Sequence, residues 1–223
     1  VGTVPFAIAS ALADSDKKDL GCHTGTISDA YRKLYLAGKL TNARKEFDTG
    51  RSSFNLAMGS SDFYDWLREN PDLFRPDSID YIHDPARIGK LSRVISINGG
   101  VQVDLMGQEN AESANGMQLS GIGGQMDFLE GAFRSAGGCG YICINSSRLT
   151  KDGVRKSNIL PFIPGSSTVS APRTLIEAVA TEYGIAHLAG KSLAERREAM
   201  IAIAHPDFRD ALRLEKPDLS LFL

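Results

Sequence analysis

The sequence is short of the features that mark several protein classes. Its 223 residues include only three cysteines, Cys22, Cys139 and Cys143, and each lies in apolar or glycine-rich sequence. This pattern predicts reduced thiols rather than a disulfide framework, and therefore a cytoplasmic protein. Neither sign of charge is in excess, because 25 Lys and Arg residues stand against 27 Asp and Glu residues. That balance argues against nucleic acid or an anionic membrane as a partner.

Long hydrophobic runs are also missing. The longest apolar stretches are far shorter than the roughly 20 residues that a membrane-spanning helix needs. The first segment, VGTVPFAIASALA, lacks the basic residues that open a signal peptide. We therefore expect no membrane partner, and because the chain does not begin with Met, we expect it to be a fragment of a longer protein.

The residues that are present predict one α/β domain over 1–223. The chain is 42% hydrophobic and 23% charged, which is enough to bury a sizeable core. Strands and helices alternate along its whole length, which predicts an open mixed sheet covered by helices on both faces. We expect helices at 4–13, 26–37, 60–70 and 191–205, and strands at 17–23, 45–50, 53–59, 138–145, 167–174 (the last ending in a turn) and 176–181.

Local signals set several boundaries. Thr26 and Asp29 have the spacing of a capping box, which places a break between strand and helix at His23–Gly25. Ser61 is the expected N-cap of the third helix. Residues 93–107 alternate on both sides of Asn98-Gly99, a pair that favours a type I′ hairpin turn.

The last helix has the clearest pattern. Ser192 and Glu195 have capping-box spacing, and Pro206 follows the helix end. Four apolar side chains are expected to face inward: Leu193, Met200, Ile201 and Ala204.

A glycine-rich segment, SGIGGQMDF, is the first candidate for chemistry. Gly121, Gly123 and Gly124 would let a ligand approach the backbone and would expose N–H groups to an anion or a thioester carbonyl. The alternative is an ordinary glycine turn before a helix that begins near Asp127.

Two titratable residues are further candidates. Glu182 follows a short apolar strand and precedes Gly184, where a carboxylate can act as a base or bind a polar ligand group, or can be merely solvated. His23 borders the predicted break and is either a general base or a core histidine. His187 and His205 have no suitably spaced partner for a metal site. Cys22 and His23 are neighbours in a strand and would point to opposite faces, so they would not form a dyad.

Seven segments, in order, carry a resemblance to a known family: LGCHTGTISDAYRKLYLAGKLTNARK, MGSSDFYDWLRENP, YIHDPARIGK, SINGGVQVDLMGQ, SGIGGQMDF, KSNILPF and VATEYGIAHLAGKSLAERREAMIAIAHPDFR. From residue 1 to about 209, the chain resembles the acetyl-CoA hydrolase/CoA-transferase family, and more closely the C-terminal domain of acetate and 4-hydroxybutyrate CoA-transferases. The resemblance implies a CoA-transferase-like fold and a homologous N-terminal domain that is absent from this chain. It also implies acyl-CoA and a small carboxylic acid as substrates, no tightly bound cofactor and a homo-oligomer.

The resemblance also implies residue roles. The family motif resembles HTE…SD, in which the glutamate attacks acyl-CoA and passes through an anhydride to a glutamyl-CoA thioester. Gly25 stands at that position, whereas His23, Thr24, Ser28 and Asp29 match the motif. Gly121, Gly123 and Gly124 match the loop that approaches CoA. Glu182 matches the glutamate of the TEYG motif and Asn98 an active-site asparagine, unless Asn98 is a hairpin turn residue.

Three functions remain open on the sequence alone. One is a CoA-transferase or acyl-CoA hydrolase without the usual nucleophile, in which Glu182 or His23 activates water in the space that the glutamate would fill. The second is a CoA-binding or acyl-CoA-binding domain without turnover. The third is a nucleotide-binding oxidoreductase domain, which lacks support because no G-x-G-x-x-G loop is followed by an acidic residue at the required distance.

Overall fold

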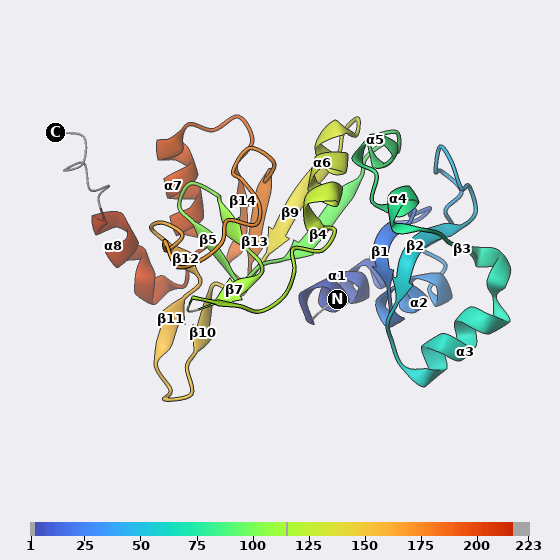
Figure 1. Cartoon of the computed structure of the whole chain (residues 1–223), viewed down its shortest axis with the longest axis horizontal. Helices are drawn as coiled ribbons and strands as arrows, with labels where there is room; N and C mark the ends of the chain where they lie inside the picture. Colours follow the sequence, from blue (N-terminus) through green and yellow to red (C-terminus); the bar gives the residue numbers. More distant parts are fainter. Residues whose placement is uncertain (1–2, 115, 216–223) are drawn as a thin grey trace. The chain divides into compact units, whose positions relative to one another are not determined.

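The computed structural model describes residues 3–114 and 116–215 and divides them into two compact units (Figure 1). The first unit contains the chain up to Gly99 together with Gly124–Gly140, and the second contains Gly100–Gly123 and the chain from Tyr141 onward. The mixed α/β architecture predicted from the sequence is confirmed, with the strands divided among several short sheets. One continuous domain stays a prediction.

The first unit is built around a parallel sheet of three strands in the order β1-β2-β3. Its strands are β1 (His23–Ile27), β2 (Ser52–Ala57), β3 (Phe74–Pro76) and, outside that sheet, β4 (Ile95–Gly99). Its helices are α1 (Thr3–Ala13), α2 (Asp29–Leu36), α3 (Ser61–Glu69), the 3₁₀ turn η1 (Pro71–Leu73), α4 (Ile79–Ile82), α5 (Pro85–Ile88) and α6 (Gln125–Arg134).

Two apolar clusters form the core of this unit. One joins the sheet to α3 through the buried side chains of Ile27, Phe54, Phe63, Trp66 and Phe74. The other lies where α1 and α2 pack together and contains Ala13, Cys22, Ala30, Leu34 and Leu40. Because Cys22 is buried in the second cluster while the ring of His23 packs against Phe47 and Phe128, the two residues do not form a dyad, as predicted.

Over its described residues, the second unit holds short strands and two helices. The strands are β5 (Gln102–Asp104), β6 (Glu109–Asn110), β7 (Ser113–Ala114), β8 (Met117–Gln118), β9 (Cys139–Cys143, which begins in the first unit), β10 (Ser147–Leu149), β11 (Arg155–Ser157), β12 (Ile159–Leu160), β13 (Ala178–Thr181) and β14 (Gly184–His187). The central strand β13 runs parallel to β9 and antiparallel to β14. The helices are α7 (Leu193–Ala202) and α8 (Pro206–Leu214).

The structure corrects the expected break at His23–Gly25. Strand β1 runs through all three residues to Ile27, and α2 begins at Asp29 with Ser28 as its N-cap. No capping box forms at Thr26, because the Asp29 carboxylate accepts hydrogen bonds from the backbone amide (2.9 Å) and hydroxyl (2.7 Å) of Ser60. The long-range contact with the start of α3 therefore outweighs the local cap.

The prediction of a hairpin turn at Asn98-Gly99 is also wrong. Asn98 and Gly99 are the last residues of β4 and neither has a positive φ, whereas β5 pairs with β12 and β6. Alternation on both sides of an Asn-Gly pair was a sound local signal, but each segment found a different strand partner. Asn98 is therefore a strand residue, which keeps its predicted role in the site open.

Other expected elements differ in smaller ways. Residues 17–22, 45–50 and 167–174 form bends, turns and isolated bridges rather than strands. The N-cap of α3 is Ser60, one residue before the expected Ser61. The capping box of Ser192 and Glu195 at the start of α7 is confirmed. Met200, Ile201 and, just past the helix end, Ala204 are buried, but Leu193 is 53% exposed because it lies in the first turn.

Candidate active site

Gly25 lies in the middle of β1, on the same face as His23. Its backbone is ordinary extended strand without a positive φ, so glycine is not required there for conformational reasons. A Cβ atom built on Gly25 would lie 2.9 Å from Nε2 of His83 and 3.5 Å from the Phe128 ring. The edge of an imidazole therefore lies closer to this point than a side chain of residue 25 would allow.

His83 is held in that place from two sides. It follows α4, and its Nδ1 lies 3.2 Å from Oδ2 of Asp127 in the first turn of α6. A Cβ atom on Gly124, the N-cap of α6, would lie 2.2–2.3 Å from the same ring, so only glycine allows this approach. Since a carboxylate only accepts, Nδ1 carries a proton, and the neutral tautomer that fits this contact has its lone pair on Nε2. Nε2 is buried and has no hydrogen-bond partner among the described residues.

His23 is the second imidazole of this region. Its Nε2 donates to the carbonyl oxygen of Ile82 (2.8 Å), and its ring packs against Phe47 and Phe128. Burial lowers the pKa of His23 from 6.5 to about 4, and the bond to Ile82 offsets this only in part. His23 is thus neutral at physiological pH, and its buried Nδ1 finds no partner in the described part of the chain.

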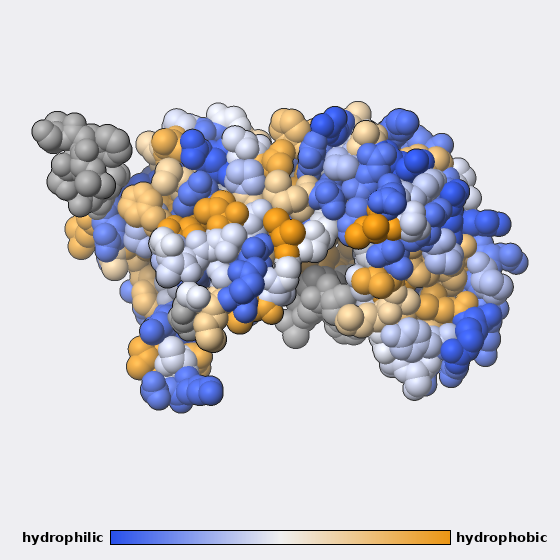
Figure 2. Space-filling model, in the orientation of Figure 1, coloured by the Kyte–Doolittle hydropathy of each residue, from blue (hydrophilic) through white to orange (hydrophobic). Residues whose placement is uncertain are grey.

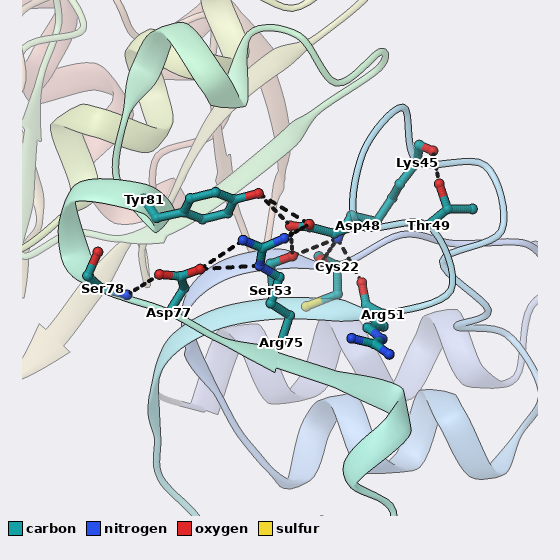
Figure 3. A network of polar contacts seen from close by, with 10 residues as sticks. All are labelled: Cys22, Lys45, Asp48, Thr49, Arg51, Ser53, Arg75, Asp77, Ser78 and Tyr81. Atoms are coloured by element: carbon teal, nitrogen blue, oxygen red, sulfur yellow. Dashed lines mark hydrogen bonds and ion pairs between the residues drawn. The ribbon is translucent and has the colours of Figure 1, made fainter.

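A polar network fixes α4, which leads into His83 (Figure 3). The Tyr81 hydroxyl donates to both oxygens of Asp48 (3.2 Å each), and Arg75 bridges Asp48 (2.7 Å) and Asp77 (3.1 Å). The guanidinium groups of Arg75 and Arg87 lie 4.3 and 3.9 Å from the centre of the Tyr81 ring. Tyr81 is therefore held at its hydroxyl and on its ring, and it orients the Ile82 carbonyl and His83 that follow.

The same network anchors the start of β1. The ammonium of Lys45 donates to the carbonyl of Cys22 (3.0 Å), the carbonyl of Arg51 (2.8 Å) and the hydroxyl of Ser53 (3.0 Å). Burial alone would raise the pKa of Asp48, but the Ser53 hydrogen bond and the charges of Arg75 and Lys45 hold it below the usual range. The carboxylate of Asp48 is therefore ionised at neutral pH.

Glu182 lies in the second unit, at the turn between β13 and β14. Oε1 accepts from the hydroxyl of the buried Ser146 (2.6 Å), and Oε2 accepts from its backbone amide (2.9 Å). Burial alone would raise the pKa of Glu182, but these two hydrogen bonds outweigh it and lower the pKa. A carboxylate held in this way is a well-oriented anion and a poor general base.

The glycine loop and Asn98 complete the set of predicted residues. Gly121 and Gly123 are exposed, no atom lies within 4 Å of a Cβ built on either, and Gly123 has a φ of +60°. A ligand can therefore reach this backbone. Asn98 is half-buried in β4, and its side-chain amide donates to the Ser96 hydroxyl (2.8 Å).

The structure gathers only some of the predicted residues. His23, Gly25 and Gly124 meet around His83 and Phe128 in the first unit. Glu182, Gly121 and Gly123 belong to the second unit. Three site residues were not predicted from the sequence: His83, Asp127 and Ser146, although the segments YIHDP and SGIGGQMDF contain the first two.

The described residues show no group of three or more His, Cys, Asp and Glu side chains that could hold a metal ion. Over the same residues, no helix has the length and apolar character that crossing a membrane requires.

The chain belongs to the acetyl-CoA hydrolase/transferase family: residues 59–216 match the family's Acetyl-CoA hydrolase/transferase C-terminal domain. It is 43% identical over 212 residues to butyryl-CoA:acetate CoA-transferase of Anaerostipes caccae, covering 95% of this chain and 47% of that protein. It is 40% identical to 4-hydroxybutyrate coenzyme A transferase of Clostridium kluyveri, covering 96% and 49%. The crystal structure of RipA from Yersinia pestis superposes with a TM-score of 0.86 at 39% identity, covering 96% and 47%. The chain therefore spans about half the length of these relatives.

Proposed function

We propose that the protein containing this chain acts on short-chain acyl-CoA thioesters and releases CoA by direct hydrolysis. Family membership supports the substrate class, since the similar proteins carry names for acetyl-, butyryl- and hydroxybutyryl-CoA chemistry. The observation that carries the choice of hydrolysis is Gly25. The resemblance places a glutamate nucleophile at this position, but this chain has no side chain there, and the edge of an imidazole lies 2.9 Å from where its Cβ would be.

Hydrolysis requires simpler functional groups in the site than acyl transfer through a covalent enzyme intermediate does. A covalent relay needs a carboxylate that can hold the acyl group in activated form. Hydrolysis needs a base for water and hydrogen-bond donors for the developing oxyanion. In the first unit, the two imidazoles beside Gly25 each have a buried ring nitrogen without a partner among the described residues. In the second unit, the exposed backbone at Gly121 and Gly123 is open to a ligand.

The partners of this chain are inferred from the length of its relatives and from its exposed apolar side chains, and its location from its cysteines. Because the relatives are about twice as long, we propose a homologous N-terminal half as a partner. Large apolar side chains are exposed in both units (Figure 2), which favours that half or a homo-oligomer as a cover. These side chains include Leu36, Leu56, Met58, Phe133, Met117, Leu119, Ile122 and Phe162. None of the three cysteines is in a disulfide, which is compatible with the cytoplasm.

The test is a product analysis on the full-length protein with acetyl-CoA. We expect CoA and acetate to form without any added acid, and no acyl transfer to labelled propionate. Mass spectrometry is expected to show no glutamyl-CoA adduct on the wild-type enzyme. Robust acyl exchange would contradict the proposal and would mean that another residue is the nucleophile.

A CoA-binding or acyl-CoA-binding domain without turnover is the second candidate. It is favoured by Glu182, because both carboxylate oxygens are engaged by Ser146 and the group is poorly placed to accept a proton. Calorimetry separates the two functions: acetyl-CoA binding without CoA release on prolonged incubation would establish the binding domain.

A further inference from the structure

We propose that His83, oriented by Asp127, is the general base that activates water in this protein. The inference rests on the proposed hydrolysis and names the residue that performs its proton transfer. It assigns to His83 the role that the sequence suggested for His23.

The position of His83 is the first support. Its Nε2 is 2.9 Å from where the side chain of residue 25 would begin. The imidazole thus stands at the origin of the side chain that the family resemblance makes the nucleophile. Gly25 and Gly124 both lack a Cβ where one would collide with this ring, so two glycines make room for it.

The unpaired nitrogen is the second support. Nε2 is buried and has no partner among the described residues, whereas Nδ1 is bound to Asp127. A buried acceptor without a donor is destabilising, and a bound water or substrate group that donates to it would remove that cost. The carboxylate of Asp127 fixes the tautomer that leaves the Nε2 lone pair available, and it stabilises the imidazolium after proton uptake.

His23 is the weaker candidate for the same step. Its Nε2 is committed to the Ile82 carbonyl, and its Nδ1 has no carboxylate or other partner among the described residues. Burial makes its Nδ1 a poor proton acceptor, because the charged form is disfavoured. We therefore assign His23 a positioning role, in which it ties β1 to the end of α4.

The proton transfers balance as follows. Water attacks the carbonyl carbon of the thioester while Nε2 of His83 takes one of its protons, which gives a tetrahedral intermediate and an imidazolium. The C–S bond then breaks, and the departing thiolate takes the proton from Nε2. A carboxylic acid and CoA leave, and His83 returns to its neutral form.

The experiment uses the full-length protein and follows CoA release from acetyl-CoA. H83N keeps an amide N–H near the position of Nδ1 for Asp127 but has no base, and H83A leaves an imidazole-sized space. We expect each to lower kcat by about 10²–10⁴-fold, with KM changing little and with free imidazole partly restoring H83A. D127N is expected to lower kcat less than H83N does. The exposed His187 supplies the matched control, H187N, which should behave as wild type.

The outcomes separate the two proposals. Wild-type turnover that survives in both H83N and H83A, or an H83A variant that imidazole does not restore, would overturn the role of His83 and leave hydrolysis standing. Absence of CoA release from the wild-type enzyme would overturn the proposed hydrolysis itself, before any variant is compared.

Discussion

Nε2 of His83 lies 2.9 Å from the point where a Cβ on Gly25 would be placed. The two residues are 58 positions apart in the sequence, on α4's C-cap and in the middle of β1. The glycine and the histidine are therefore coupled, because the missing side chain of residue 25 lets the ring of His83 approach this closely.

Gly25→Ala tests this relationship through stability. The added methyl group forces His83 to move against Phe128, Gly124 and Asp127, and we expect a loss of about 1–2 kcal/mol in the free energy of unfolding. In an H83A background the same substitution should cost almost nothing, which gives a coupling energy in a double-mutant cycle. Chemical denaturation of the wild type, the two single variants and the double variant measures this coupling energy.

Gly121→Ala is the matched control for that cycle. A Cβ there meets no atom within 4 Å and φ is not positive, so the change should remain within about 0.5 kcal/mol. Additive effects of Gly25→Ala and H83A would contradict the contact.

Gly25→Glu should introduce a carboxylate at the position of the family's nucleophile. The strand backbone of Gly25 accepts a side chain without a φ penalty. His83 is the obstacle, so we expect little acyl exchange in the single variant and more in Gly25→Glu with H83A. The measurement is exchange between acetyl-CoA and labelled acetate in the full-length protein, with mass spectrometry of a CoA adduct on residue 25. If neither variant forms the adduct, residue 25 is not at the acyl-transfer position.

CoA binding at the glycine loop can be tested with one pair of variants. Gly123→Val places a branched side chain on the exposed backbone and should weaken CoA binding by at least about tenfold in calorimetry. Part of any effect comes from the positive φ of Gly123, which disfavours valine. Gly153→Val is the control, because Gly153 has a similar φ (+75°) and equally open surroundings. Equal losses of affinity in the two variants would rule out a specific role for the loop.

Local sequence signals predicted the elements that depend on neighbours in the chain. The capping box of Ser192 and Glu195 was visible because both partners lie within one helical turn. The end of β13 at Thr181, directly before Glu182, was predicted from a short apolar run that precedes a glycine. These features need no knowledge of distant residues.

The candidate site depended on contacts that no local pattern records. His83 and Asp127 are 44 residues apart, and Ser146 and Glu182 are 36 apart, so neither pair has a characteristic spacing. Asp29 satisfied a capping pattern but binds Ser60 instead, and Asn98-Gly99 satisfied a turn pattern but lies in a strand. In each case the tertiary partner outweighed the local preference.

Ser146→Ala should raise the pKa of Glu182. The variant removes the hydroxyl bond to Oε1 and keeps the backbone amide bond to Oε2, so the pKa should rise only part of the way to its ordinary value. Carboxyl ¹³C chemical shifts followed against pH measure this directly. Ser147→Ala is the control, because Ser147 is one residue further on and binds Arg155 instead. An equal change in the pKa of Glu182 in both variants would contradict the role of the Ser146 hydroxyl.

Burial of neutral His23 should make stability depend on pH in a defined window. The unfolded chain takes up a proton on His23 near pH 6.5, whereas the folded chain resists protonation until about pH 4. Because the unfolded state binds more protons between these values, stability falls as pH is lowered from about 6.5 to 4 and levels off below. The pKa difference sets an upper limit of about 3 kcal/mol for this loss. The charges of Lys45 and Arg87 lower the pKa of His23 further, and the charge of Asp48 opposes them.

The variant His23→Gln tests this dependence. It keeps a donor for the Ile82 carbonyl without a titrating ring, so its denaturation midpoint should change less between pH 7 and 5 than that of the wild type. His187→Gln, at an exposed position on β14, should retain the wild-type pH dependence. A His23→Gln variant with the full wild-type dependence would show that this histidine is not buried in its neutral form.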